Sequence, residues 1–273
     1  MKTTSSNSLA ATFRALHANE QLLLLPNAWD GASARLIEAC GAAAIATSSA
    51  AVSWSHGVPD GEHLTLEMLL ATTREIIRAV RVPVSVDLEA GYGATPEAIG
   101  PVVRQVVDTG VVGINLEDGA APPEVLVAKL EVARRAAAAA GVELFINART
   151  DVYLRGLVAP EERVQETLKR ARLYREAGCD GLFVPGIARP EEIAAIAQAA
   201  GVPLNVMALP GLAPAPKLKE LGVRRLSLGT ALAQAALGTV RRHCVALLER
   251  GEYGGVFEGQ VSYGEMNALL SRS

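Results

Sequence analysis

The sequence predicts an α/β fold, most simply a single (β/α)8 barrel of the TIM type. The chain has 273 residues, about the length of one such barrel. Half of the residues are hydrophobic but only 4% are aromatic, so Ala, Val, Leu and Ile must build the core, as in parallel sheets covered on both faces. Short apolar runs also alternate with longer amphipathic ones almost to the end of the chain. Eight alternating strands and helices close most simply as a barrel, with a doubly wound open sheet as the alternative.

The strands are predicted from short apolar runs that are too brief for helices and are bounded by turn-forming or polar residues. There are eight such runs, each followed by a change to amphipathic or polar sequence. They cover residues 22–26, 42–48, 82–87, 111–117, 143–149, 181–186, 202–208 and 223–229.

The helices are predicted where apolar residues recur at intervals of three and four, often after Asp, Thr or Pro and before Gly. The clearest examples are residues 30–41, 65–80, 96–110 and 160–178. No linker rich in Pro, Gly or Ser divides the chain, so we expect one domain over residues 1–273, with the barrel at about 20–235. The helical extension over about 236–273 exceeds one closing helix, and we expect it to cover the barrel or to pack on another subunit.

Charge and cysteine content exclude several classes of protein. The net charge is −3 and no run of Lys or Arg stands out, which disfavours nucleic acid as a partner. The three cysteines are odd in number and widely spaced, as expected of reduced residues in a cytosolic protein. No segment has the apolar length of a membrane span or of a signal peptide. We therefore expect a soluble, cytoplasmic protein that does not bind membranes.

Polar side chains stand at the ends of successive predicted strands. Asp87 and Glu89 end the third predicted strand. Asn115 and Glu117 end the fourth, and Arg149 ends the fifth. Residues two apart in a strand face the same way, and the active site of a (β/α)8 barrel forms at the carboxyl ends of its strands. We therefore expect these side chains to share one mouth. The alternative is that each carboxylate only caps the next helix or pairs with a nearby base.

These residue types indicate a magnesium site that also binds a carboxylate. Clustered carboxylates repel one another unless a cation neutralises them, and hard oxygen ligands suit Mg²⁺, with Mn²⁺ as a possible substitute. The absence of a His-Cys cluster disfavours zinc. Arg149 supplies a planar fork for a substrate carboxylate. Ser48, Ser49 and the amides that follow them are expected to hold a second anionic group or a carbonyl oxygen.

An ordered series of short segments resembles the isocitrate lyase/phosphoenolpyruvate mutase superfamily over about residues 20–230. The segments are "LLLPNAWDGASARLIEACG", "TSSA", "GVPDG", "VDLEAGYG", "INLEDG" and "INARTDVYL". The resemblance implies a (β/α)8 barrel in a homotetramer, a dimer of dimers whose subunits exchange a C-terminal helix. It also implies Mg²⁺ and a small 2-oxo or 2-hydroxy acid, from which an enolate forms when a C–C or P–C bond breaks.

The resemblance further implies a role for each matching residue. Asp87 corresponds to the direct metal ligand, and Glu89 and Glu117 to residues that hold metal-bound waters. The segment Ser48, Ser49 and Ala50 corresponds to the receptor of the substrate carboxylate and carbonyl oxygen. The candidate catalytic residues are Asp60, Glu117 and Arg149, of which Asp60 matches a loop aspartate of the mutases. The candidate substrate-binding residues are Ser48, Ser49, Ala50, Asp87, Asn115, Arg149 and Asn205.

One segment departs from the family pattern. Lyases of the family carry a Lys-Lys/Arg-Cys-Gly-His motif in the loop after the fourth strand, whereas this chain has "EDGAAPPEVLVAKLEV", without cysteine or histidine. We expect this loop to be short and to lead directly into a helix. The favoured function is a Mg²⁺-dependent lyase that cleaves a C–C bond of an oxaloacetate- or methylisocitrate-type acid through an enolate. The alternatives are P–C bond chemistry on phosphonopyruvate or phosphoenolpyruvate, with Asp60 taking part, and a 2-oxo acid binding protein without catalysis.

Overall fold

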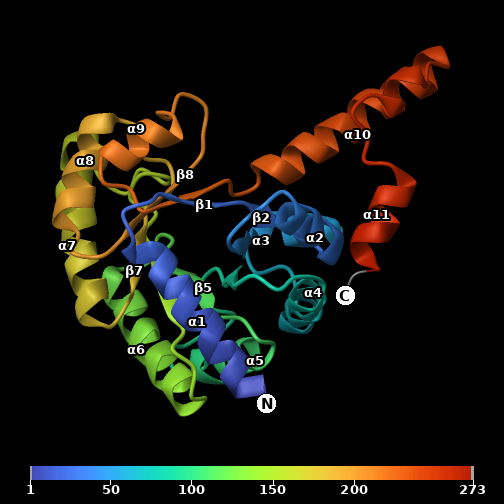
Figure 1. The fold of residues 1–273 in the computed structure, drawn as a ribbon. Coiled ribbons are helices and arrows are strands. Elements are labelled where there is room, and N and C mark those ends of the chain that lie inside the picture. Colours follow the sequence, from blue (N-terminus) through green and yellow to red (C-terminus); the bar gives the residue numbers. More distant parts are fainter. Residues whose placement is uncertain (1, 272–273) are drawn as a thin grey trace.

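The computed structural model describes residues 2–271. Within this range, nine short parallel strands form a nearly closed barrel surrounded by helices, a TIM-type α/β fold (Figure 1). Their hydrogen-bonded order is β1-β9-β8-β7-β6-β5-β4-β3-β2. The strands are β1 (Leu23–Leu25), β2 (Asn27–Ala28), β3 (Ile45–Thr47), β4 (Val84–Asp87), β5 (Gly113–Glu117), β6 (Phe145–Arg149), β7 (Gly181–Phe183), β8 (Leu204–Met207) and β9 (Arg225–Ser227). Each predicted strand contains an observed one, and the predicted barrel is confirmed.

The ninth strand, β2, was not predicted and lies just beyond the first predicted strand, from which Pro26 separates it. Strand β1 pairs with β9, whereas β2 pairs with β3. Proline has no N–H to donate to a ladder, so the strand is interrupted where its hydrogen bonding passes from one neighbour to the other. A single continuous segment therefore joins the two ends of the sheet.

Eight helices cover the outside of the barrel or follow its strands, and side-chain caps set where several of them begin. The Asp30 carboxylate accepts a hydrogen bond from the Ser33 amide at the start of α2, and Thr65 caps α4 through the Met68 amide. Pro123 begins α6 directly after a short loop, which confirms the prediction for this segment. The eight are α2 (Gly31–Ala39), α3 (Ser49–Ser55), α4 (Leu66–Ala79), α5 (Ile99–Asp108), α6 (Pro123–Ala139), α7 (Arg163–Glu176), α8 (Pro190–Ala199) and α9 (Ala215–Glu220).

The amino-terminal helix α1 (Lys2–Ala18), which was not predicted, closes one end of the barrel. Phe13 is fully buried, and its ring meets that of Phe145 edge to face at 5.5 Å. The His17 ring stacks on Phe145 at 4.0 Å. These aromatic contacts lie at the amino-terminal ends of the strands, so the opposite end is left for a functional site.

The main hydrophobic core lies between the strands and the outer helices, where Ile114, Ile146 and Val206 are fully buried. The alternate positions of the same strands face the barrel interior, which is polar. Asn147 donates to Asn115 and Asn205 there, at 2.9 and 3.1 Å. The strands are therefore buried on both sides, with an apolar outer face and a polar inner one.

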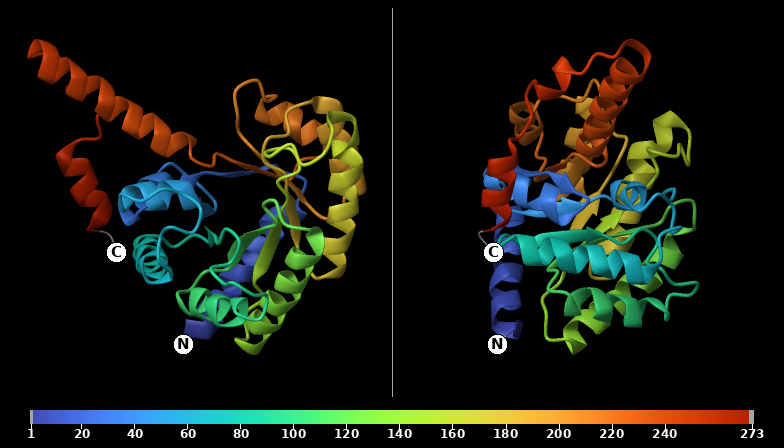
Figure 2. Two further views of the ribbon diagram at one scale, coloured as in Figure 1. Left: turned by 180° about the vertical axis from the view of Figure 1, so that it is seen from behind. Right: turned by 90° about the vertical axis from the view of Figure 1, so that its right-hand side faces the viewer.

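The C-terminal helices leave the barrel, as Figures 1 and 2 show. Helix α10 (Ala231–Arg250) projects away from the other elements, and α11 (Tyr263–Leu270) returns to α2, where Arg35 Nε donates to the Leu269 carbonyl at 2.9 Å. Two short 3₁₀ helices, Pro160–Glu162 and Gly254–Phe257, complete the described structure. None of the helices in residues 2–271 combines the length and apolarity needed to cross a bilayer.

Two apolar surfaces are exposed, one on α10 and one beside its base. Leu237, Val240 and Leu248 of α10 are 52%, 57% and 83% exposed. Beside the base of α10, a groove of about 740 Å³ runs along β1 and α2, lined by Leu24 and Leu36 among others. The predicted C-terminal extension is thus present as helices that expose apolar side chains.

Candidate active site

The carboxyl ends of β3 to β6 bring most of the predicted site residues together. In the sheet register Asp87 pairs with Asn115, and Glu117 pairs with Arg149. The Arg149 Nη1 lies 2.7 Å from Glu117 Oε2, so these two form an ion pair across neighbouring strands. The acids and the guanidinium thus share one mouth, as predicted from their positions at strand ends.

Asp87 has an incompletely satisfied carboxylate. Its Oδ2 accepts a hydrogen bond from the Ser49 amide at 3.2 Å, and its own amide donates to Thr47 Oγ1 at 2.9 Å. The Oδ1 atom is buried and has no hydrogen-bond partner among residues 2–271. A buried acceptor without a partner costs free energy, so this oxygen is suited to a cation or a donor from a ligand.

The segment Ser48–Ala50 forms the start of α3 beside Asp87. Ser48 is the N-cap residue, and its hydroxyl lies 3.5 Å from the Ala51 amide. Ser48, Ser49 and Ala50 are all buried. Backbone amides at the start of a helix have no intrahelical acceptor, and the Ser49 amide uses Asp87 instead.

Glu89 takes part in a cluster that joins two loops, which we call the clasp and define as Glu62, Glu89 and Tyr92. Glu89 accepts from the Glu62 amide at 2.8 Å and from the Tyr92 hydroxyl at 3.0 Å. Glu62 in turn accepts from the Tyr92 amide at 2.8 Å. All three residues have left-handed backbones, with φ of 58°, 49° and 54° in sequence order. Such conformations are strained for non-glycine residues, and here three hydrogen bonds hold them.

Two of the acids hold their protons more tightly than usual. Burial raises the pKa of Glu89 to about 7, and the negative charges of Asp87 and Asp60 add to this effect. Burial also raises the pKa of Glu117 to about 8, against the opposing effect of Arg149. Asp60 is exposed on the loop between α3 and α4, and its charge acts on the same cluster. Crowded acids of this kind favour a neutralising cation.

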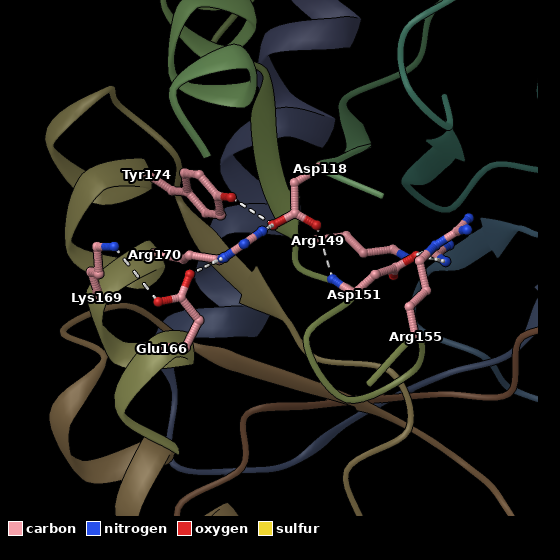
Figure 3. Close-up of polar contacts among 8 residues, drawn as sticks. All are labelled: Asp118, Arg149, Asp151, Arg155, Glu166, Lys169, Arg170 and Tyr174. Atoms are coloured by element: carbon pink, nitrogen blue, oxygen red, sulfur yellow. Dashed lines mark hydrogen bonds and ion pairs between the residues drawn. The ribbon is translucent and has the colours of Figure 1, made fainter. Parts of the chain in front are cut away.

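Arg149 is held by a buried network that Figure 3 displays. Its Nε and Nη2 donate to the two carboxylate oxygens of Asp151 at 2.8 and 3.2 Å, and Asp151 is fully buried. The Asp151 amide donates to Asp118, which also accepts from Arg170 at 2.7 Å and Tyr174 at 2.6 Å. Burial tends to lower the pKa of Arg149, but Glu117, Asp87 and Asp151 outweigh it and raise that pKa.

The predicted asparagines lie deeper in the barrel. Asn205 donates to the Val206 and Arg225 carbonyls and to Ser227 Oγ, and its oxygen accepts from Asn147. Asn115 accepts from Asn147 in the same layer. These side chains form a floor beneath the mouth.

The residues at the mouth fit Mg²⁺ held by one protein ligand and several waters. The unpartnered Asp87 Oδ1 is the atom that suits direct coordination. Within the described chain, no three acidic, His or Cys side chains are gathered into a ready-made metal cage. Mg²⁺ commonly keeps several waters and binds through one or two carboxylates, so this arrangement suits it better than it suits zinc.

Several residues of the mouth and of the floor beneath it were not predicted. Asp151 stands two positions after Arg149, and the period of two in a strand could have indicated a shared face. Arg225 is fully buried inside the barrel, and its Nε and Nη1 have no partner within residues 2–271. Arg225 stands two positions before Ser227, and the same period of two could have indicated that both face the barrel interior. Glu62 lies in another loop from Glu89, and nothing local in the sequence indicates their contact.

Comparisons with known proteins agree on one family. A model of the family described as phosphoenolpyruvate phosphomutase matches residues 13–248. The "Uncharacterized protein Rv1998c" of Mycobacterium tuberculosis (strain ATCC 25618 / H37Rv) is 35% identical over 263 residues, covering 95% of this chain and 96% of that protein. The 2-methylisocitrate lyase of Bacillus subtilis (strain 168) is 30% identical over 212 residues, covering 74% and 68%. The solved structure of a phosphonopyruvate hydrolase complex with oxalate and Mg²⁺ superposes with a TM-score of 0.84 at 26% identity, covering 96% and 95%.

Proposed function

The chain belongs to the phosphoenolpyruvate phosphomutase family and is an enzyme of the isocitrate lyase/phosphoenolpyruvate mutase type, and from this premise we propose its reaction. We propose a Mg²⁺-dependent lyase that cleaves a C–C bond of a small 2-oxo or 2-hydroxy di- or tricarboxylic acid. The oxaloacetate and methylisocitrate types are favoured, with an enolate as intermediate. The observation that carries this proposal is the buried Asp87 Oδ1, which has no partner in the described residues. It lies in the same mouth as Arg149, whose guanidinium is held by Asp151.

Asp87 would hold Mg²⁺ directly, whereas Glu89 and Glu117 would hold its waters. This division follows from their contacts, because Glu89 is occupied by the clasp and Glu117 by Arg149. When bound, the metal would supply positive charge where negative charge develops on the substrate's 2-oxo oxygen.

The chain's own residues would bind and orient the substrate. Three nitrogens of Arg149 contact Asp151 and Glu117, and donors on both Nη atoms remain for a substrate carboxylate. The segment Ser48–Ala50 would hold the carbonyl end through its backbone amides. Asn115 and Asn205 would line the floor, which keeps the ligand at the level of Asp87.

P–C bond chemistry is a second candidate function, and Asp60 is the observation that favours it. The negative charge of Asp60 contributes to the raised pKa of Glu89, so this exposed loop aspartate acts on the acidic cluster. The likeness to phosphonopyruvate hydrolase adds weight. Asp60 would then take part in the reaction, whereas C–C cleavage would not require it.

The test is a product-release assay with purified protein on oxaloacetate, methylisocitrate, isocitrate and phosphonopyruvate, each with Mg²⁺ and with EDTA. Pyruvate release from oxaloacetate at a rate well above that of the metal alone supports the lyase. Asp60→Ala should abolish turnover of phosphonopyruvate if the second candidate holds, and leave C–C turnover measurable if the first does. Saturable, Mg²⁺-dependent binding of oxo acids without turnover of any of the four would instead indicate a binding protein.

We also propose that the subunits exchange α10 within a homotetramer. The exposed apolar side chains of α10 and the apolar groove along β1 and α2 support this, because the two surfaces are complementary in chemistry. In that assembly the groove of one subunit would receive α10 of its partner.

A further inference from the structure

A second arginine, Arg155, meets the same buried carboxylate as Arg149. Arg155 Nε donates to Asp151 Oδ2 at 2.8 Å, and Arg149 Nη2 donates to that same oxygen at 3.2 Å. Figure 3 shows the two side chains converging on Asp151. The Arg155 side chain is 51% exposed, whereas that of Arg149 is 15% exposed. One guanidinium is therefore deep in the mouth and the other is at its rim.

The loop that carries Arg155 is held in a fixed turn. The Arg155 amide donates to the Asp151 carbonyl at 2.9 Å, and the Leu157 amide donates to the Val152 carbonyl at 3.1 Å. The loop after β7 packs against this turn at Gly186, whose φ is +86°. A Cβ there would come within 3.0 Å of the Leu154 backbone. Arg155 is thus placed by backbone contacts from two loops.

The charge of Arg155 is only partly compensated. Arg149 is paired with both Asp151 and Glu117. Asp151, which Arg149 shares, is the one acidic partner of Arg155 in the part of the chain that the structure describes. Asp151 is shared between two guanidinium groups, whereas Glu117 pairs only with Arg149, so part of the Arg155 charge is left uncompensated at the rim. The Nη atoms of Arg155 are available to an anion.

We propose that Arg155 binds a second anionic group of the substrate, a carboxylate or a phosphonate at the end remote from the 2-oxo acid. This inference rests on the proposed function, because it uses the same mouth. Arg149 and Ser48–Ala50 hold the 2-oxo acid end, and the more exposed Arg155 contacts Asp151 nearer to the solvent. Arg155 therefore selects dianionic oxo acids over monoanionic ones of similar length.

The test compares four ligands by isothermal titration calorimetry in the presence of Mg²⁺. Oxalate reports on the inner site alone, and 2-oxobutyrate is a monoanionic oxo acid. Difluorooxaloacetate carries a remote carboxylate, and phosphonopyruvate carries a remote phosphonate. Arg155→Met should weaken binding of the two ligands with a remote anion by about tenfold, as expected for loss of a charge-assisted hydrogen bond. It should leave oxalate and 2-oxobutyrate within about twofold.

Arg104→Met is the matched control. Arg104 pairs with an aspartate four residues away and is 54% exposed, like Arg155, but it lies on α5. This control should leave all four affinities unchanged. Arg155→Lys keeps the charge and should fall between wild type and Arg155→Met, which also guards against a folding defect of the methionine variant. A larger loss for phosphonopyruvate than for difluorooxaloacetate identifies the remote group as a phosphonate, and the reverse identifies it as a carboxylate.

Two results would overturn the inference. Equal weakening of oxalate and of the two ligands with a remote anion would mean that Arg155 acts only by holding Arg149 in place. Unchanged affinities for all ligands would mean that Arg155 does not touch them. Failure of the wild-type protein to bind oxalate with Mg²⁺ would be a different result, because it overturns the proposed function itself.

Discussion

At the scale of single residues, the Asp87 carboxylate is divided between two tasks. One oxygen accepts a backbone hydrogen bond, whereas the other is buried without a partner in the described residues. The first fixes the position of the carboxylate and the second is left for a ligand. Replacing Asp87 by a side chain of the same shape but without charge should therefore affect metal binding without affecting folding.

We expect Asp87→Asn to weaken Mg²⁺ binding by about tenfold or more, because even partners outside the first coordination shell commonly contribute this much. Isothermal titration calorimetry with MgCl₂ measures the affinity. Asp108→Asn is the control, since Asp108 is an exposed aspartate on α5. An unchanged affinity in Asp87→Asn would remove Asp87 as the metal ligand.

In the proposed function, Asp151 would act on the ligand through Arg149. Asp151→Asn should weaken oxalate binding by about 10-fold to 100-fold, because a bidentate contact between charged groups is lost and the Arg149 fork is no longer oriented. Calorimetry with oxalate at saturating Mg²⁺ measures this loss. Mg²⁺ affinity serves as the internal control and should change little. A variant that lowers only the melting temperature, with oxalate affinity intact, would show that Asp151 is structural.

At the scale of elements, helix α1, which closes one end of the barrel, contains a buried histidine. His17 Nδ1 donates to the Phe13 carbonyl, because a carbonyl oxygen can only accept, and Nε2 is buried without a partner in the described structure. Burial lowers the pKa of His17 to about 3, and the positive charge of Arg225 adds to the effect. His17 is therefore neutral in the folded protein at ordinary pH.

This makes the attachment of α1 sensitive to acid. Between about pH 3 and 6.5 the unfolded chain binds a proton at His17 that the folded chain does not, so stability falls as the pH drops below 6.5. The loss is roughly 1.4 kcal/mol per pH unit. We expect His17→Gln to lose less stability than wild type between pH 7 and 4, measured by urea unfolding. His63→Gln, at an exposed loop position, should follow wild type. Parallel curves for His17→Gln and wild type would contradict this account.

The elements that could be predicted are those with a local signal. The strands were predicted because their apolar runs are short and regularly spaced, and Asp87, Glu117 and Arg149 because each stands at a strand end. Helix α1 was missed because its burial depends on Phe13 and His17 meeting the far end of the barrel. The contact of Glu89 with Glu62 joins two different loops. Only the folded backbone brings this pair together.

At the scale of the whole molecule, the apolar groove and α10 are the two surfaces through which we propose that subunits associate. A groove of about 740 Å³ beside a projecting helix with exposed leucines suits association between copies of the chain. The barrel itself has its own core, so loss of association need not unfold it.

We expect Leu36→Glu, which places a charge in the groove, to convert the proposed homotetramer into a species of the monomer mass, 28.5 kDa. Size-exclusion chromatography with light scattering measures the mass, and circular dichroism checks folding. Val125→Glu, at a 37% exposed position on α6, is the control and should keep the wild-type mass. An unchanged mass for Leu36→Glu would argue against the groove as the interface.

The clasp also has a consequence for how the sequence can vary over evolution. Glu62, Glu89 and Tyr92 each adopt a backbone conformation that glycine would accept more easily. Glycine at Glu89 would relieve its own strain but remove the hydrogen bonds that hold the other two. Glycine at Glu62 would remove the acceptor of the Tyr92 amide, and glycine at Tyr92 would remove the hydroxyl that donates to Glu89. We therefore expect the three positions to change together among relatives. Sequence changes in the loop that carries Asp60 and Glu62 are thereby linked to changes in the loop that carries Glu89 and Tyr92, although the two loops are separated in the chain by helix α4 and strand β4.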